Sequence, residues 1–246
     1  MSRAWVILKR IGRVLKFLLF CVILTVCILL LWRVFSTGIP KEIEHLEPTA
    51  ALRSAYAQQG EKLYVFEQGY DEITRAERNA GYFGVAEALF IPDANQAQIV
   101  FRYNNSTIKA VAEDYSLPSI PDRETELFDV TLVVYVDLTP DNEEDNYSTG
   151  SDTVKAIRIK PTSGKRADST LYNFYRYVFD FGSAEEPVDL KALLEEGSII
   201  AIHSQIYYKD DLDYEKTPYG ALCLYDLRRD NNAVKFSSQE KKALGE

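Results

Sequence analysis

The sequence is poor in the residues that mark special classes of protein. Its 246 residues include only 3 cysteines, 2 histidines, 12 glycines and 9 prolines. The low cysteine content excludes a disulfide-rich scaffold, and the low glycine and proline content excludes a collagen-like or proline-rich fibre. Because 46% of the residues are hydrophobic and 26% are charged, the composition is that of a folded chain rather than a disordered one.

Acidic residues are absent from the first 40 positions, which contain six basic ones. The rest of the chain therefore holds 22 of the 28 basic residues and all 37 acidic ones, a net charge of −15. A body this acidic repels phosphate backbones, so we expect no binding to nucleic acid. The same charge favours a basic partner or a cation.

The longest apolar run lies in the basic N-terminal part. It consists of 16 uncharged residues, Phe17–Trp32. At about 1.5 Å per residue this run is slightly short of a hydrocarbon core about 30 Å thick. Lys16 and Arg33 can extend their charged ends to the membrane surface, and two further apolar residues follow Arg33. We therefore expect a transmembrane anchor over residues 17–35.

A cleaved signal peptide is the alternative to an anchor. Its apolar core normally spans only about 7–15 residues and ends at a small-residue cleavage site. Here the run is longer, and the small residues that follow it, Ser36-Thr37-Gly38, match such a site poorly.

The charges beside the run predict its orientation. Five basic residues precede it, and Glu42 and Glu44 follow it. The positive-inside rule then places residues 1–16 in the cytoplasm and the C-terminus outside a cell membrane that the chain crosses once. Cys223 is the only cysteine beyond the span, so the outer part has no internal disulfide. This absence leans towards a bacterial surface.

Beyond the anchor we expect a juxtamembrane stalk over residues 36–60, a β domain over 61–228 and a polar tail over 229–246. Thr49 is placed to begin a short helix in the stalk, and Gly60 is placed to end it. The tail has no sustained hydrophobic period, and we expect it to be loose.

Alternating apolar and polar residues predict strands in the β domain. Val130, Leu132 and Val134 alternate with polar positions, which is typical of a strand with one face towards the core and one towards water. We expect eight strands, over residues 62–68, 82–91, 97–103, 130–138, 153–160, 171–181, 198–208 and 219–227.

Residues with turn and cap propensity separate these strands. Pro92–Asn95 is expected to close one hairpin, and Pro161–Lys165 to close another between Ile159 and Leu171. Short helices are expected over residues 107–115, capped by Ser106, and over residues 190–196, capped by Asp189.

Together these elements predict a mainly β fold class: an N-terminal transmembrane helix followed by an antiparallel Ig-like β-sandwich with a few short helices. The strand region exceeds the size of a typical Ig domain, about 100 residues, so we expect one enlarged sandwich, with two small domains as the alternative. The cysteine–tryptophan pattern of true immunoglobulin domains is absent, so the comparison concerns architecture alone.

Two acidic clusters are candidates for binding a metal cation such as calcium. Their acidic residues are Asp137, Asp141, Glu143 and Asp145 in the first cluster and Asp211, Asp213 and Glu215 in the second. Calcium takes about six to eight oxygen ligands, of which such loops can supply several. Neither cluster has the spacing of an EF-hand, so a solvated acidic loop is the alternative for each. We expect no other cofactor, because glycine-rich phosphate-binding loops are absent.

Aromatic residues are abundant, and residues 171–181 are the densest segment. Tyr172 and Phe174 share a face with Arg176, opposite the face expected in the core. The pair is a candidate exposed binding surface for a sugar ring or a partner strand. Cross-strand packing is the alternative.

No set of residues with a catalytic pattern is recognisable. His203 and its neighbour Ser204 point to opposite faces of a strand, and no G-x-S-x-G motif occurs. We therefore expect a non-catalytic binding or assembly module for an extracytoplasmic protein or an envelope polymer. The alternatives are a metal-assisted ectohydrolase that uses an acidic loop and a calcium-stabilised structural spacer.

Overall fold

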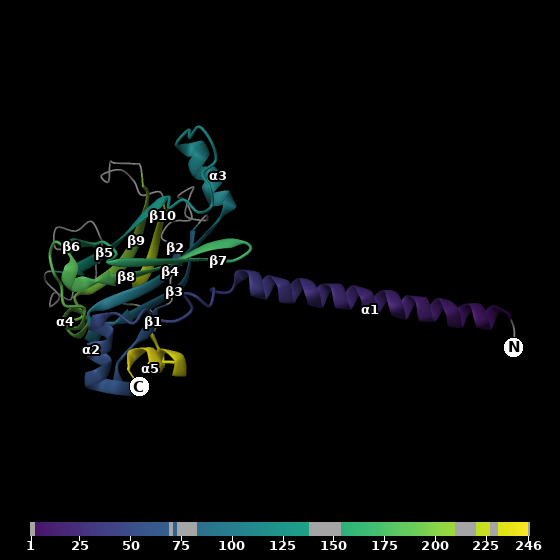
Figure 1. Cartoon of the computed structure of the whole chain (residues 1–246), viewed down its shortest axis with the longest axis horizontal. Helices are drawn as coiled ribbons and strands as arrows, with labels where there is room; N and C mark the ends of the chain where they lie inside the picture. The colour runs from purple at the N-terminus through teal and green to yellow at the C-terminus, as the bar shows by residue number, and fades with distance from the viewer. Residues whose placement is uncertain are drawn as a thin grey trace.

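The computed structural model describes residues 3–68, 71–72, 83–137, 154–209, 220–226 and 231–245. This part of the chain consists of a long N-terminal helix and a β domain with two antiparallel sheets and short helices (Figure 1). The prediction of a mainly β protein with antiparallel sheets and a few short helices is confirmed.

Helix α1 (Arg3–Thr37) projects away from the β domain (Figure 1). Its apolar window Arg13–Trp32 is 20 residues long, and none of it is buried against the rest of the protein. The hydroxyl of Thr25 donates to the carbonyl of Cys21 at 2.9 Å, so this polar group has a partner inside the helix. Helix α1 is therefore a candidate membrane span, although a signal sequence would share its length and composition.

The strands form two antiparallel sheets. In spatial order, the larger sheet contains β11 (Asn231–Ala233), β1 (Phe66–Gln68), β3 (Phe83–Ile91), β4 (Gln96–Asn104), β8 (Tyr172–Asp180) and β7 (Ser163–Asp168). The smaller sheet contains β2 (Asp71–Glu72), β10 (Gly220–Asp226), β9 (Ile199–Tyr208), β5 (Phe128–Asp137) and β6 (Val154–Ile159). The hairpin predicted at Pro92–Asn95 joins β3 to β4.

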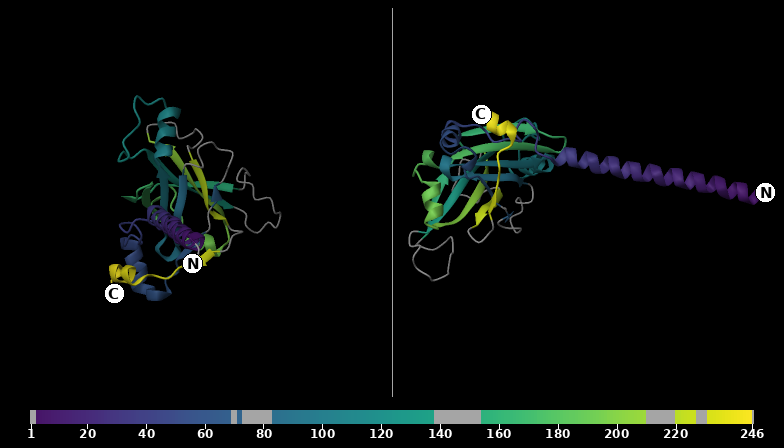
Figure 2. Two further views of the ribbon diagram at one scale, coloured as in Figure 1. Left: turned by 90° about the vertical axis from the view of Figure 1, so that its right-hand side faces the viewer. Right: turned by 90° about the horizontal axis from the view of Figure 1, so that it is seen from below.

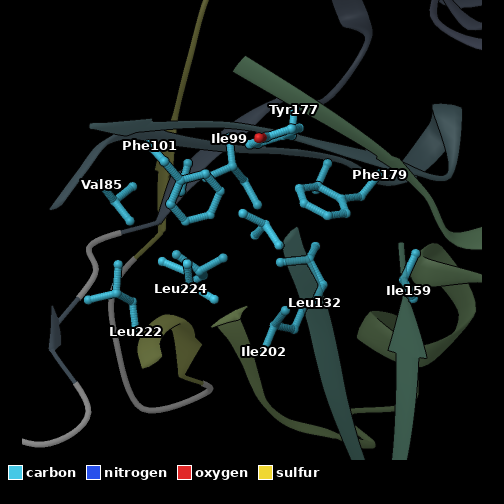
Figure 3. Packing of buried hydrophobic residues seen from close by; sticks show 14 of the residues in the cluster. Val85, Ile99, Phe101, Leu132, Ile159, Tyr177, Phe179, Ile202, Leu222 and Leu224 are labelled. Carbon is cyan, nitrogen blue, oxygen red and sulfur yellow. The ribbon is translucent and has the colours of Figure 1, made fainter. Parts of the chain in front are cut away.

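A hydrophobic core lies between the two sheets (Figure 3). Side chains of both sheets point into it, among them Ile99, Phe101 and Phe179 of the larger sheet and Leu132, Ile202 and Leu224 of the smaller one. Helix α3 (Asn105–Asp114) contributes Ile108 to this core, and helix α4 (Leu190–Glu195) contributes Leu190. Asp189 caps α4 as predicted, whereas α3 begins two residues earlier than predicted because Asn104, not Ser106, is its cap.

The second predicted hairpin is wrong. Strand β6 belongs to the smaller sheet and β8 to the larger one, so the chain changes sheets at Pro161. Residues Ser163–Asp168, which overlap the predicted turn, form strand β7 and pair with β8. Their sequence, Ser-Gly-Lys-Arg-Ala-Asp, has little strand propensity, and pairing with β8 is what makes them a strand. The charged side chains suit an edge position.

The segment between α1 and helix α2 (Ala50–Gln59), residues 39–49, lies on the outer face of the larger sheet. We call it the N-terminal strap. The sequence predicts a stalk here, whereas the structure packs Ile43, only 1% exposed, against Val100 of β4 and Phe174 of β8. The β domain therefore begins almost directly after α1.

Polar side chains of the larger sheet bind the backbone of the N-terminal strap. Gln98 accepts a hydrogen bond from the N–H of Glu47 at 2.7 Å and donates one to its carbonyl at 2.8 Å. Arg176 donates from Nε to the carbonyl of Ile43 at 2.9 Å and from Nη2 to that of Glu44 at 3.3 Å. The alternation of polar and apolar residues predicts that Gln98 and Arg176 lie on a solvent-exposed face of the sheet. In the structure, the N-terminal strap covers this face.

Arg176 is the largest of the fully buried side chains described. Its guanidinium forms an ion pair with Glu87 of β3 at 2.5 Å. Burial raises the pKa of the Glu87 carboxyl above its usual range, and the guanidinium offsets part of this rise. Because a buried charge needs close partners, the carboxylate and the two strap carbonyls together hold Arg176 in place.

Two helices complete the layer over the larger sheet. Thr49 caps α2 as predicted, accepting a hydrogen bond from the N–H of Leu52. Helix α5 (Ser238–Leu244) lies in the tail that the sequence predicts to be loose. It is fixed because Glu240 accepts a hydrogen bond from the N–H of Leu46 at 3.1 Å and because Leu244 packs in a small core with Leu52. Figure 2 shows α5 beside α2 on one side of the β domain.

We expect Arg176→Ala to lower the free energy of unfolding by about 3 kcal/mol, because it removes a fully buried guanidinium and leaves the partly buried Glu87 carboxylate and two strap carbonyls without their partner. Urea unfolding of the full chain in detergent, followed by near-UV circular dichroism, measures the change. Lys209→Ala is the control, since Lys209 pairs with Glu126 at 3.1 Å on the surface, and we expect it to cost less than about 1 kcal/mol. Equal losses for the two variants would contradict this account of Arg176.

Candidate binding groove on the smaller sheet

The outer face of the smaller sheet carries a band of polar and aromatic side chains. The strand register places Arg158 of β6 opposite Val133 of β5, and Val133 opposite His203 of β9. Thr131 lies opposite Gln205 in the same ladder. Since neighbouring strands are about 4.8 Å apart, these side chains share one small area of the surface.

Contacts within this band orient its aromatic side chains. The hydroxyl of Tyr207 donates to Oε1 of Gln205 at 2.7 Å. The rings of Tyr135 and His203 meet edge to face, with their centroids 4.9 Å apart. Tyr207 is only 6% exposed, so its ring is held between neighbours and its position is well defined.

A groove of about 540 Å³ opens beside this band, near the point where the chain leaves β6. Thr131 and Tyr207 are nearly buried and form its floor, whereas Arg158, Lys160 and Glu185 are exposed at its rim. The volume falls in the range of small-ligand sites, about 300–1,000 Å³. The groove is large enough for a sugar ring or a few residues of a peptide.

Arg158 sets the charge next to the floor of the groove. Burial raises the pKa of Tyr135 and of Tyr207, and the Arg158 guanidinium opposes both rises. Within the described ranges Arg158 forms no ion pair. Its five N–H donors therefore face the groove or water.

A second hollow of about 210 Å³ adjoins the groove and shares Thr131 and Lys160 with it. Glu126 and Asp129 line this hollow. Lys160 therefore lies between the groove, which carries Arg158, and the hollow, which carries the carboxylates of Glu126 and Asp129. A ligand that extends from the groove into the hollow would meet both signs of charge.

Among the predicted cation ligands, only Asp137 lies in the described part of the chain. It ends β5, is half-buried, and donates its backbone N–H to the carbonyl of Ser198 at 2.8 Å. The other candidates lie outside the described residues: Asp141, Glu143, Asp145, Asp211, Asp213 and Glu215. The described residues contain no group of three or more side chains suited to a metal ion. Calcium binding stays a prediction.

The predicted aromatic surface at Tyr172 and Phe174 needs a correction. Phe174 is fully buried beside Ile43 of the N-terminal strap, so it offers no exposed surface. Tyr172 is half-buried, and the guanidinium carbon of Arg102 lies 5.1 Å from the centre of its ring. The face is occupied by a segment of the same chain.

Sequence reasoning missed the groove. Arg158 is an ordinary polar position of an alternating strand, and Ser183 and Glu185 follow a different strand in the other sheet. Their proximity depends on how the two sheets pack. The register also places Cys223 of β10 opposite His203, a pairing that the strand pattern alone does not show.

We expect Arg158→Gln to raise the pKa of Tyr135 and Tyr207 further, because it removes the positive charge that opposes the effect of burial. NMR titration of tyrosines labelled at the ring carbon that bears the hydroxyl would measure both values. Lys155→Gln serves as the control, since this exposed lysine on the same strand pairs with Glu186. Unchanged pKa values in the Arg158 variant would place the guanidinium away from the two rings.

Comparisons with known proteins do not add to this description of the groove. No family model matches the chain, and no curated protein or solved structure matches it either. The functional proposal therefore depends on the groove and on the position of α1.

Proposed function

We propose that the chain is a single-pass membrane protein that holds an Ig-like β-sandwich outside the cell membrane and uses it as a non-catalytic binding module. The groove beside β6 is its ligand site. The observation that carries the proposal is a pocket of about 540 Å³ with Arg158 and Lys160 at its rim, on a domain that directly follows an unburied apolar helix.

The position of α1 supports the membrane anchor. A soluble protein would bury large apolar side chains, yet the whole window Arg13–Trp32 is uncovered. Basic residues precede this window and acidic residues follow it, so the positive-inside rule favours a cytoplasmic N-terminus.

The order of the strands supports the Ig-like architecture. In the larger sheet, the run β3-β4-β8-β7 corresponds to strands A-B-E-D of an Ig domain. In the smaller sheet, the run β10-β9-β5-β6 corresponds to G-F-C-C′. The chain changes sheets between β4 and β5, between β6 and β7 and between β8 and β9, as an Ig chain does after B, C′ and E. Strands β1, β2 and β11 are additions at the margins, which fits one enlarged sandwich.

The chemistry of the groove supports binding of a ligand with an anionic group. The rim carries the guanidinium of Arg158, the ammonium of Lys160 and the single carboxylate of Glu185, so positive charge predominates there. A guanidinium recognises carboxylate or phosphate through two parallel hydrogen bonds. An envelope polymer or an acidic segment of a protein carries such groups. The described lining contains no histidine or cysteine, which favours binding over nucleophilic catalysis.

The metal-assisted ectohydrolase and the calcium-stabilised spacer are the alternatives. Each depends on the two predicted acidic clusters, of which only Asp137 lies among the described residues. The groove needs neither cluster, so we rank binding first.

For the topology, we expect a C-terminal tag to be digested when protease is added to intact cells or protoplasts. An N-terminal tag should be protected until the membrane is broken, because the basic end stays in the cytoplasm. Immunoblotting of both tags measures this. A C-terminal tag that survives until lysis would reverse the orientation.

For the binding role, we expect crosslinking on intact cells to capture a partner through the groove. The double variant Arg158→Glu/Lys160→Glu should reduce the captured amount about tenfold or more, because reversing two rim charges costs at least about 1.4 kcal/mol of binding free energy. Quantitative mass spectrometry of the purified full chain measures the loss.

The matched control is the double variant Lys62→Glu/Lys242→Glu. It makes the same change in net charge at exposed positions of the short helix η1 (Gly60–Lys62) and of α5. We expect it to capture the partner as well as the unmodified chain does. Equal loss in both double variants would show an effect of net charge and remove the groove from the proposal.

A further inference from the structure

The chain leaves almost no free linker between α1 and the β domain. Helix α1 ends at Thr37, and Ile39 already packs against the small cluster of Ile43, Val100 and Phe174 on the larger sheet. Only Gly38 lies between the helix and the packed strap. The β domain therefore cannot move far from the end of the helix.

The length of the helix beyond its apolar window sets the distance of the domain from the membrane. Five residues separate Trp32, the end of the window, from Thr37. At about 1.5 Å per residue they span about 7.5 Å, which is close to the thickness of one headgroup layer, roughly 5–8 Å. Ile39, and with it the adjoining end of the β domain, then lies at the outer margin of the headgroups.

The end of the domain that adjoins α1 is the turn between β7 and β8. Ala167 of β7 and Tyr172 of β8, which flank this turn, pack against the same small cluster as Ile39. Figures 1 and 2 agree in showing the β7 end of the larger sheet beside the C-terminal end of α1, with α4 at the opposite end of the domain.

One exposed apolar side chain lies in this turn, and another lies in a loop that is tied to it. Outside α1, the described large apolar residues that are exposed are Tyr64, Ile120 and Leu171. Leu171, 38% exposed, lies in the β7–β8 turn, and Ile120, 59% exposed, lies in the loop that follows α3. Arg123 ties that loop to the turn, because its guanidinium donates to the carbonyl of Ser169 at 2.6 Å and to that of Tyr172 at 2.8 Å.

We propose that this end of the β domain, the β7–β8 turn with Leu171 and the loop with Ile120, rests on the phospholipid headgroup layer of the membrane that holds α1. The inference rests on the proposed membrane anchor. Its partner is the lipid surface itself. The short connection at Gly38 holds the domain there, and the two apolar side chains enter the interface.

This placement points the candidate groove away from the membrane. Strand β8 begins beside the β7–β8 turn. Ser183 and Glu185 of the groove come just after its opposite end. Nine residues of strand at about 3.3 Å each place them roughly 30 Å from the lipid surface. The ligand site is then presented to the space beyond the membrane.

A depth measurement on the full chain in liposomes tests the proposal. In a background with Cys21→Ala, Cys27→Ala and Cys223→Ala, a fluorophore is attached to Leu171→Cys or, as the matched control, to Glu195→Cys at the end of α4. The liposomes contain phosphatidylcholine and phosphatidylglycerol, with or without a lipid that carries a nitroxide on its headgroup. Flotation on a density gradient first establishes that each labelled chain is anchored.

We expect the nitroxide to reduce the emission of the label at position 171 about twofold, because an interfacial residue lies at the depth of the headgroups. The label at position 195 should be almost unaffected. Equal quenching at the two positions, whether strong or weak, would overturn the proposed orientation. A chain that fails to float would instead contradict the anchor, so the two failures are distinguishable.

A second variant tests the role of the short connection. A flexible glycine–serine linker inserted between Thr37 and Gly38 should bring the quenching at position 171 towards that at position 195, because the domain can then leave the surface. A difference between the positions that is unchanged by the linker would overturn the argument that the connection at Gly38 holds the domain on the membrane.

Discussion

The outer layer of the β domain depends on the buried guanidinium of Arg176. On one side it is paired with Glu87, and on the other it binds the carbonyls of Ile43 and Glu44. A guanidinium on a sheet face would normally be hydrated, and the carbonyls of an irregular segment normally need water. Through Nε and Nη2 the guanidinium supplies donors to the strap carbonyls and holds the N-terminal strap on the sheet, whereas the buried Nη1 has no partner in the described part of the chain. As a result, the segment that leads to α1 is part of the folded domain.

Local signals in the sequence predict much of the fold, and long-range contacts account for what they miss. Thr49 and Asp189 were assigned correctly as helix caps because a cap acts on N–H groups only two or three residues away. Strand β7 and the N-terminal strap were missed because their structure depends on residues far along the chain. Gln98 and Arg176 are examples. The alternation of polar and apolar residues predicts which face of the sheet they occupy, but it cannot predict that the N-terminal strap covers this face. The same limit hid the groove, whose rim combines Arg158 with residues of the other sheet.

The net charge of the chain and the local charge of the groove point to different partners. A body with a net charge of −15 favours a basic partner, whereas Arg158 and Lys160 favour an anionic group at close range. Both effects can act together because salt screens charges beyond about 8–10 Å. If the groove binds as proposed, the net charge of the body would oppose a densely charged polyanion, while a protein segment or envelope polymer with few anionic groups would be repelled less.

The N-terminal strap also affects the order in which the protein can fold during synthesis. Ile43 is bound by a side chain 133 residues further along the chain, and Leu46 by one 194 residues further. At a synthesis rate of about 5–20 residues per second, the strap waits roughly 7–27 s for Arg176 to emerge. During that interval Ile43 lacks its contact with Phe174 of β8. The contact between Leu46 and Glu240 of α5 requires a still longer stretch of chain to be made first.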